Sequence, residues 1–128
     1  MKAVRYYSYG DSRVLVYEEA GRPVAGAGQV VVKVAGTAFN PLDVAIRAGF
    51  VQQVFPVAFP HVPNYDVAGV ITEAGEGVSG WSAGDAVVAF LPVTAPGAAA
   101  EYVAAPAGAL AAPAPLSWPT GRRCPRPA

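Results

Sequence analysis

The chain has 128 residues, which is enough for one domain with its own core and too few for two sizeable ones. Nine basic and nine acidic side chains cancel, so no overall charge would attract nucleic acid or an anionic membrane surface. The single cysteine, Cys124, excludes an internal disulfide and the usual multi-cysteine zinc site. No apolar run reaches the roughly 20 residues that span a bilayer, and the first residues lack the apolar core of a secretory signal. We therefore expect a cytoplasmic protein.

The first predicted elements are short strands bounded by turn residues. The composition includes 14 glycines and 13 prolines, which favours short strands and tight turns over long helices. Strands are predicted over residues 2–6, 14–18, 29–35, 67–73, 86–90 and 99–104. Their close spacing is typical of an all-β domain, and a closed or partly closed barrel fits it.

One short helix interrupts these strands directly after Phe39. Asn40 is suited to cap it, Pro41 to occupy its first position and Gly49 to end it. The sequence therefore predicts a helix over residues 41–48.

The character of the chain changes after residue 104. The following residues are nearly all alanine and proline and show no apolar periodicity. We expect a barrel domain over residues 1–104 and an extended linker with a non-native or frameshifted tail over residues 105–128. The tail ends in Arg122, Arg123 and Arg126 without any acidic residue, which looks foreign to the domain.

Several short motifs occur in a characteristic order. They are Met1-Lys2-Ala3-Val4, Gly28-Gln29-Val30-Val31-Val32-Lys33-Val34, Asn40-Pro41-Leu42-Asp43, Asp66-Val67-Ala68-Gly69-Val70, Gly84-Asp85-Ala86-Val87 and Glu101-Tyr102-Val103. In this order they resemble the N-terminal, GroES-like (alcohol dehydrogenase-like) domain of the medium-chain dehydrogenase/reductase superfamily, in its zinc-independent quinone oxidoreductase branch. The resemblance covers residues 1 to 117 and implies a mainly β, partly open barrel with one or two short helices.

The resemblance implies that the usual zinc ligands are replaced. Asn40 matches the position of a cysteine ligand in the zinc-dependent alcohol dehydrogenases, and Tyr65-Asp66 matches a His-Glu pair. A neutral amide and a protonated phenol are poor Zn²⁺ ligands, so we expect no metal site. What the resemblance then implies is hydride transfer from NADPH to a quinone, an enone or a similarly activated small molecule.

The nucleotide-binding part of such an enzyme is not expected within these residues. Superfamily members bind NADPH through a Rossmann domain that follows the barrel and opens with a glycine-rich turn between strand and helix. The nearest candidate here, Gly75-Glu76-Gly77-Val78-Ser79-Gly80, is followed by a second turn signal at Gly84-Asp85, so we interpret it as a hairpin loop. We expect a truncated oxidoreductase that binds no cofactor tightly and has little activity alone.

Three residues are the candidate catalytic groups. The resemblance carries over Asn40 and Asp43 as groups facing the nicotinamide or the substrate, although both also suit a helix N-terminus. Tyr65 could offer its hydroxyl to a carbonyl oxygen, or it could simply bury its ring at a barrel rim.

Five more residues are candidates for facing the substrate or the cofactor: Phe39, Arg47, Phe55, His61 and Asp66. Three of them also have a plainer interpretation. Arg47 could meet a cofactor phosphate or be an exposed helical side chain, and His61 could relay protons or be solvated in its loop. Phe55 could line an apolar acceptor site or rest on the barrel.

Two functions outside this enzyme class stay open. A stand-alone barrel could bind a small molecule or a protein without chemistry, and a GroES-type co-chaperonin shares the barrel but forms rings. A homodimer is possible, through an interface other than the Rossmann sheets. A frameshifted gene and a deliberately expressed domain would each account for the short chain.

Overall fold

The computed structural model describes residues 1–113 of the chain. Its elements are β1 (Lys2–Arg5), the 3₁₀ helix η1 (Ser12–Val14), β2 (Val16–Glu19), β3 (Gln29–Ala38), α1 (Pro41–Ala48), β4 (Asp66–Ala74), β5 (Ala86–Phe90), β6 (Tyr102–Pro106), the 3₁₀ helix η2 (Ala107–Ala109) and β7 (Leu110–Ala111). No helix within this part of the chain is long and apolar enough to cross a membrane.

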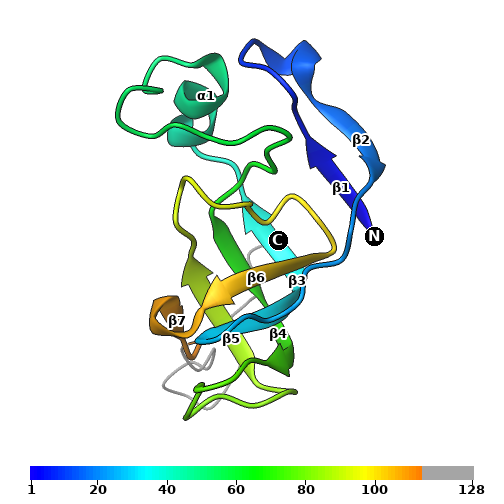
Figure 1. The fold of residues 1–128 in the computed structure, drawn as a ribbon, viewed down its shortest axis with the longest axis vertical. Coiled ribbons are helices and arrows are strands. Elements are labelled where there is room, and N and C mark those ends of the chain that lie inside the picture. Colours follow the sequence, from blue (N-terminus) through cyan, green and yellow to red (C-terminus); the bar gives the residue numbers. More distant parts are fainter. Residues whose placement is uncertain (114–128) are drawn as a thin grey trace, which may run out of the picture.

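The strands form two antiparallel sheets. One is a ribbon of β1 and β2, and the other has five strands in the order β6-β3-β4-β5-β7. Figure 1 shows the ribbon and α1 at one end of the molecule and the five-stranded sheet at the other. Over the described residues β6 and β7 stay at opposite ends of the larger sheet, so the barrel is open on one side. This confirms the predicted mainly β, partly open architecture.

The core lies on the inner face of the larger sheet. It includes Val30 and Val32 from β3, Ile71 from β4, Val87 from β5 and Val103 from β6, all fully or almost fully buried. Gly69 is required where β3 and β4 approach each other, because a Cβ atom there would lie 2.1 Å from the Lys33 carbonyl oxygen.

Helix α1 has the predicted bounds. Asn40 is its N-cap, Pro41 is at its first position, and Gly49 ends it with a φ of 86°. The carboxylate of Asp43 accepts a hydrogen bond from the Asn40 backbone N–H at 2.7 Å, which satisfies a donor at the start of the helix.

The glycine-rich segment after β4 is a hairpin loop, as predicted. Strands β4 and β5 on either side of it are antiparallel, with Val70 opposite Ala86. A phosphate-binding turn would instead lead from a strand directly into a helix.

Several predicted bounds differ from those in the structure. Val14 belongs to η1 instead of a strand, and the sixth strand begins at Tyr102. The ordered domain also continues past residue 104, because β6 runs to Pro106 and β7 pairs with Val88 and Ala89 of β5. The predicted linker is therefore wrong for residues 105–111. The predicted foreign tail falls within residues 114–128, which lie outside the described residues.

Candidate functional site

Asn40 and Asp66 meet at the junction between α1 and the larger sheet. The Asn40 side-chain Nδ2 donates a hydrogen bond to Asp66 Oδ2 at 2.7 Å, and both side chains are half-buried. Asn40 is the N-cap of α1 and Asp66 is the first residue of β4. Two of the predicted site residues, 26 positions apart in the chain, are therefore brought into direct contact.

Asp43 lies behind this pair and connects its two backbone segments. The side chain is 1% exposed, and its second carboxylate oxygen, Oδ1, accepts the Asn64 backbone N–H at 2.9 Å. Because Oδ2 accepts the Asn40 N–H, one carboxylate ties the start of α1 to the turn that leads into β4. Asp43 is buried, and in this structure its carboxylate holds the backbone of Asn40 and Asn64 in place.

Two open apolar hollows flank the Asn40–Asp66 pair. One, of about 600 Å³, is lined by Asp66 and by residues of β3, β5 and β7 that include Thr37, Val88, Phe90 and Ala111. The other, of about 560 Å³, is lined by Asn40 together with Phe39, Val44 and Phe50. A polar pair between two apolar surfaces is a common arrangement for binding a small, largely apolar molecule.

Phe39 and Phe55 have different surroundings. Phe39 is 55% exposed and lines the second hollow beside Asn40. Phe55 is half-buried against the hydrophobic core, which agrees with its plainer interpretation.

Tyr65 and His61 form a buried pair. The Tyr65 hydroxyl and His61 Nε2 are 2.9 Å apart, and the side chains are 1% and 2% exposed. Burial lowers the pKa of His61 to about 4 and raises the pKa of Tyr65 above its ordinary value, so both groups are neutral near pH 7. The interpretation of His61 as a solvated loop residue was wrong. The hydroxyl proposed for catalysis by Tyr65 is directed to His61 in this structure.

Arg47 is also buried, where the sequence favoured an exposed helical side chain. It lies in the last turn of α1 with 8% exposure, and its Nε–H donates to the Gly10 carbonyl oxygen at 3.3 Å. The plainer interpretation of Arg47 was therefore wrong, and no contact connects it to the Asn40–Asp66 pair.

Sequence reasoning missed Asn64 and Tyr6. Asn64 has a φ of 75°, in the left-handed region, and its buried Oδ1 has no partner within residues 1–113. The sequence singled out the Asn64-Tyr65-Asp66 motif. The role of Asn64 in the turn depends on its left-handed backbone conformation, which only the structure shows. Tyr6 is fully buried, and its backbone exchanges two hydrogen bonds with His61.

The described residues contain no group of three or more His, Cys, Asp or Glu side chains that could hold a metal ion. The Asp66 and Asp43 carboxylates next to Asn40 already accept hydrogen bonds from its side-chain amide and its backbone N–H. These donors do not form a usual zinc ligand set.

The family of the chain follows from its similarity to known sequences. The family model for the alcohol dehydrogenase GroES-like domain matches residues 26–115. The chain belongs to this family. Within the medium-chain dehydrogenase/reductase superfamily, it falls in the quinone oxidoreductase branch. The resemblance to the GroES-like domain and to the quinone oxidoreductase branch, inferred from the ordered motifs, is thereby confirmed.

Curated relatives of this GroES-like domain are longer proteins. A chloroplast envelope quinone oxidoreductase homolog from Arabidopsis thaliana is 37% identical over 106 residues, which are 82% of this chain and 32% of the relative. Quinone oxidoreductase from Rattus norvegicus is 35% identical over 103 residues, covering 80% of this chain and 30% of the relative. The chain thus spans about a third of the length of the curated relatives it matches.

Solved structures of the superfamily share the fold. A mycobacterial quinone oxidoreductase is 28% identical with a TM-score of 0.79, covering 94% of this chain and 36% of that one. An alcohol dehydrogenase from Pyrobaculum aerophilum, solved with cobalt and zinc bound, is 30% identical with a TM-score of 0.79, covering 88% of this chain and 41% of that one. A metal-bound protein and a quinone oxidoreductase thus share this barrel, so any argument about zinc must come from the donor residues.

Proposed function

We propose that this GroES-like domain is the N-terminal catalytic part of a zinc-independent, NADPH-dependent oxidoreductase that reduces a quinone or an enone. The observation that carries the proposal is the Asn40–Asp66 hydrogen bond between two apolar hollows, in a chain of the quinone oxidoreductase branch. Conjugated acceptors are already polarised, so positioning and a few hydrogen-bonding groups support their reduction.

The residues of this site fit one face of a flat, partly apolar ring. Asn40 uses one side-chain N–H for Asp66, and its second side-chain N–H makes no hydrogen bond within residues 1–113. This N–H is suited to the oxygen of a carboxamide or a carbonyl group, while Phe39, Val88 and Phe90 offer apolar surface. NADPH, when bound, supplies the hydride, and Asn40 and Asp66 orient what lies beside them.

Zinc independence is supported by the donors at the positions where the resemblance places metal ligands. Asn40 offers an amide, and the Tyr65 hydroxyl is buried against His61. Zn²⁺ prefers thiolate, imidazole and carboxylate donors, and among the three positions that the resemblance matches to metal ligands only Asp66 supplies one. Zinc added to the purified chain should therefore leave its melting temperature unchanged.

We further propose that the chain has little activity alone. Its glycine-rich segment is a hairpin loop, and it matches only about a third of each relative. The strand-to-α-helix turn within residues 1–113, from β3 to α1, contains no glycine, and the Asp43 carboxylate occupies the start of its helix, so it differs from a pyrophosphate-binding turn.

The first test combines NADPH titration calorimetry with a quinone-dependent absorbance assay on one sample of the chain. No binding and no turnover are expected. Tight binding with turnover would overturn the proposed inactivity, because the chain would then hold a cofactor site of its own.

The second test concerns Asn40 in an active protein, made by joining residues 1–113 to the C-terminal two thirds of the Arabidopsis relative. Asn40→Ser should preserve the helix cap but lower kcat/KM by about tenfold, because the amide is lost. Tyr65→Phe is the matched control, since its hydroxyl is directed to His61 and should matter less. Unchanged turnover in Asn40→Ser would remove the amide from the proposed mechanism.

A stand-alone binding barrel is the alternative that the open apolar hollows favour. Saturable quinone binding by the chain, together with an inactive fusion protein, would support it. Sedimentation separates the remaining possibilities, because a monomer or homodimer disfavours a co-chaperonin and a large ring supports one.

A further inference from the structure

A cavity lies between the β1–β2 ribbon and β6. Its volume is about 260 Å³, and its walls come from β1, the segment after β2, the start of β3, β6, and the loops before β4 and after β5. An engineered protein cavity of about 150 Å³ can hold benzene, so this cavity has room for an aromatic ring with a substituent. Neither Asn40 nor Asp66 lines it, so it is separate from the proposed site of reduction.

Most of the cavity wall is apolar and is held in place by the fold. It includes Val62, Val103, several alanines and three prolines, Pro23, Pro60 and Pro96. Proline has a fixed φ and loses no side-chain freedom when a ligand packs against it. The loop after β5 is fastened to the loop before β4, because the Gly97 N–H donates to the Val62 carbonyl oxygen at 2.7 Å. An apolar ligand would therefore meet a wall that is already formed.

Three polar side chains line the same cavity and have unused hydrogen-bond donors. They are Arg5, Gln29 and Tyr102, and each is half-buried, so a ligand in the cavity can contact them. Arg5 donates from Nε to Glu18 and from Nη2 to the Glu19 carbonyl oxygen, and its Nη1 has no partner within residues 1–113. Gln29 uses only its side-chain oxygen, as an acceptor. Its amide N–H groups and the Tyr102 hydroxyl make no hydrogen bond in that part of the chain.

The charged groups beside these donors are mainly basic. Glu18 compensates the charge of Arg5. The guanidinium of Arg22 lies 3.8 Å from the centre of the Tyr102 ring, and no acidic side chain of residues 1–113 is paired with it. Among the described residues, no Asp or Glu lines the cavity. Unused donors next to an uncompensated positive charge favour an acidic ligand group that accepts several hydrogen bonds.

We propose that this cavity binds a small carboxylic acid with an apolar body, such as an aromatic monocarboxylate. The carboxylate accepts hydrogen bonds from the unused donors of Arg5, Gln29 and Tyr102, and the apolar body packs against the prolines and valines of the wall. This binding site is independent of the proposed reduction, since the two share no residue.

The test is a ¹⁵N NMR titration of the full chain with benzoate, with chloride keeping the ionic strength constant. Saturable shifts are expected in the backbone amide signals of Val62, Gly97 and Tyr102, while those of Asn40 and Asp66 stay unchanged. Benzyl alcohol has the same ring without the carboxylate and should bind about tenfold more weakly. The absence of saturable shifts with benzoate, shifts at Asn40 and Asp66 instead, or equal affinity for benzyl alcohol would each overturn the proposal.

Two variants locate the site, and one is a control. Ala104→Leu adds bulk to a half-buried position of the cavity wall and should abolish saturable benzoate binding. Ala86→Leu is the matched control, because Ala86 is exposed on β5 and does not line the cavity. Tyr102→Phe keeps the ring beside Arg22 but loses the hydroxyl, so benzoate affinity should fall about fivefold without added bulk. Benzoate affinity unchanged in a folded Ala104→Leu chain, or unchanged in Tyr102→Phe, would contradict the site.

Discussion

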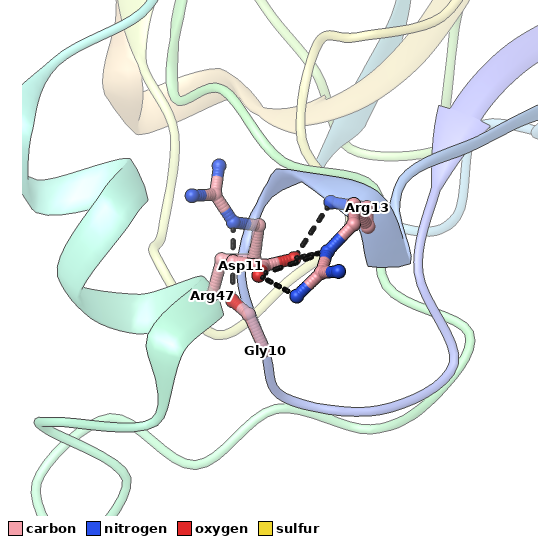
Figure 2. Close-up of polar contacts among 4 residues, drawn as sticks. All are labelled: Gly10, Asp11, Arg13 and Arg47. Carbon is pink, nitrogen blue, oxygen red and sulfur yellow. Dashed lines mark hydrogen bonds and ion pairs between the residues drawn. The ribbon is translucent and has the colours of Figure 1, made fainter.

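The two ends of helix α1 are built differently. At the N-terminal end, the Asn40 amide and both oxygens of Asp43 have partners at 2.7 to 2.9 Å. At the C-terminal end, the Arg47 side chain has one long hydrogen bond, to the Gly10 carbonyl oxygen (Figure 2), and no acidic partner within residues 1–113. Buried polar groups are usually satisfied, so the first end holds a geometry by itself, whereas the second leaves most N–H groups of the Arg47 side chain without a partner among the described residues. The same helix thus carries a preorganised site at one end and an incompletely paired side chain at the other.

The largest effect is expected from Asp43, which organises the satisfied end. Asp43→Ala leaves the buried backbone N–H groups of Asn40 and Asn64 without their acceptor, which should lower the free energy of unfolding by about 3 kcal/mol. Asp43→Asn keeps one acceptor oxygen and should cost about half as much. Urea unfolding of the chain measures both values.

Asp85 provides the control for this prediction. Its carboxylate accepts the Ser82 backbone N–H at 2.8 Å in the exposed hairpin loop, so it has one local contact of the same kind. Asp85→Ala should cost less than about 1 kcal/mol. Equal losses in the two alanine variants would mean that Asp43 is an ordinary capping residue.

The second effect is the pH dependence that the buried His61 imposes. Its pKa of about 4 in the folded chain lies below the value of 6.5 expected when the chain is unfolded, so folding favours the neutral ring. This stability is fully present above pH 6.5 and is lost as the pH falls toward 4, by up to about 3 kcal/mol. His61 is the only histidine in the chain. Urea unfolding between pH 7 and 4.5 should show that the free energy of unfolding falls with pH in the parent chain and changes little in His61→Asn. Equal pH dependence in the two proteins would contradict this role of His61.

The third effect tests the turn that Asp43 holds. Asn64 has a φ of 75°, which a residue with a Cβ atom adopts at a cost unless it is Asn or Asp. Asn64→Ala should therefore lower stability by about 1 kcal/mol, while Asn64→Gly, which suits this φ and removes an unpaired oxygen, should stay within about 0.5 kcal/mol. Thermal unfolding of the two variants measures both changes in stability. A glycine variant less stable than the alanine variant would show that contacts of the Asn64 side chain, and not its positive φ, determine the stability of this turn.

Local signals in the sequence predicted the elements, whereas distant contacts decided the site. Asn40, Pro41 and Gly49 are sufficient to predict α1, because capping depends on neighbouring residues. Strand β7 was missed since its alanine-rich sequence has no periodicity and depends on pairing with β5. The burial of Arg47 depends on Gly10, 37 residues away, and no pattern around α1 indicates it. Asn40 and Asp66 were both named, but only the fold shows that they bind each other.

The smallest effect comes from comparing two buried tyrosines that differ in one respect. The Tyr65 hydroxyl is 2.9 Å from His61 Nε2, whereas the Tyr6 hydroxyl has no partner in the described part of the chain. Tyr65→Phe should cost about 1 kcal/mol, because the hydrogen bond is lost and a buried ring nitrogen is left unpaired. Tyr6→Phe should change stability by less than about 0.5 kcal/mol, because no hydrogen bond is lost. Urea unfolding of the two variants measures both values. A loss in Tyr6→Phe equal to that in Tyr65→Phe would contradict this comparison, because it would mean that the Tyr6 hydroxyl makes a stabilising contact of its own.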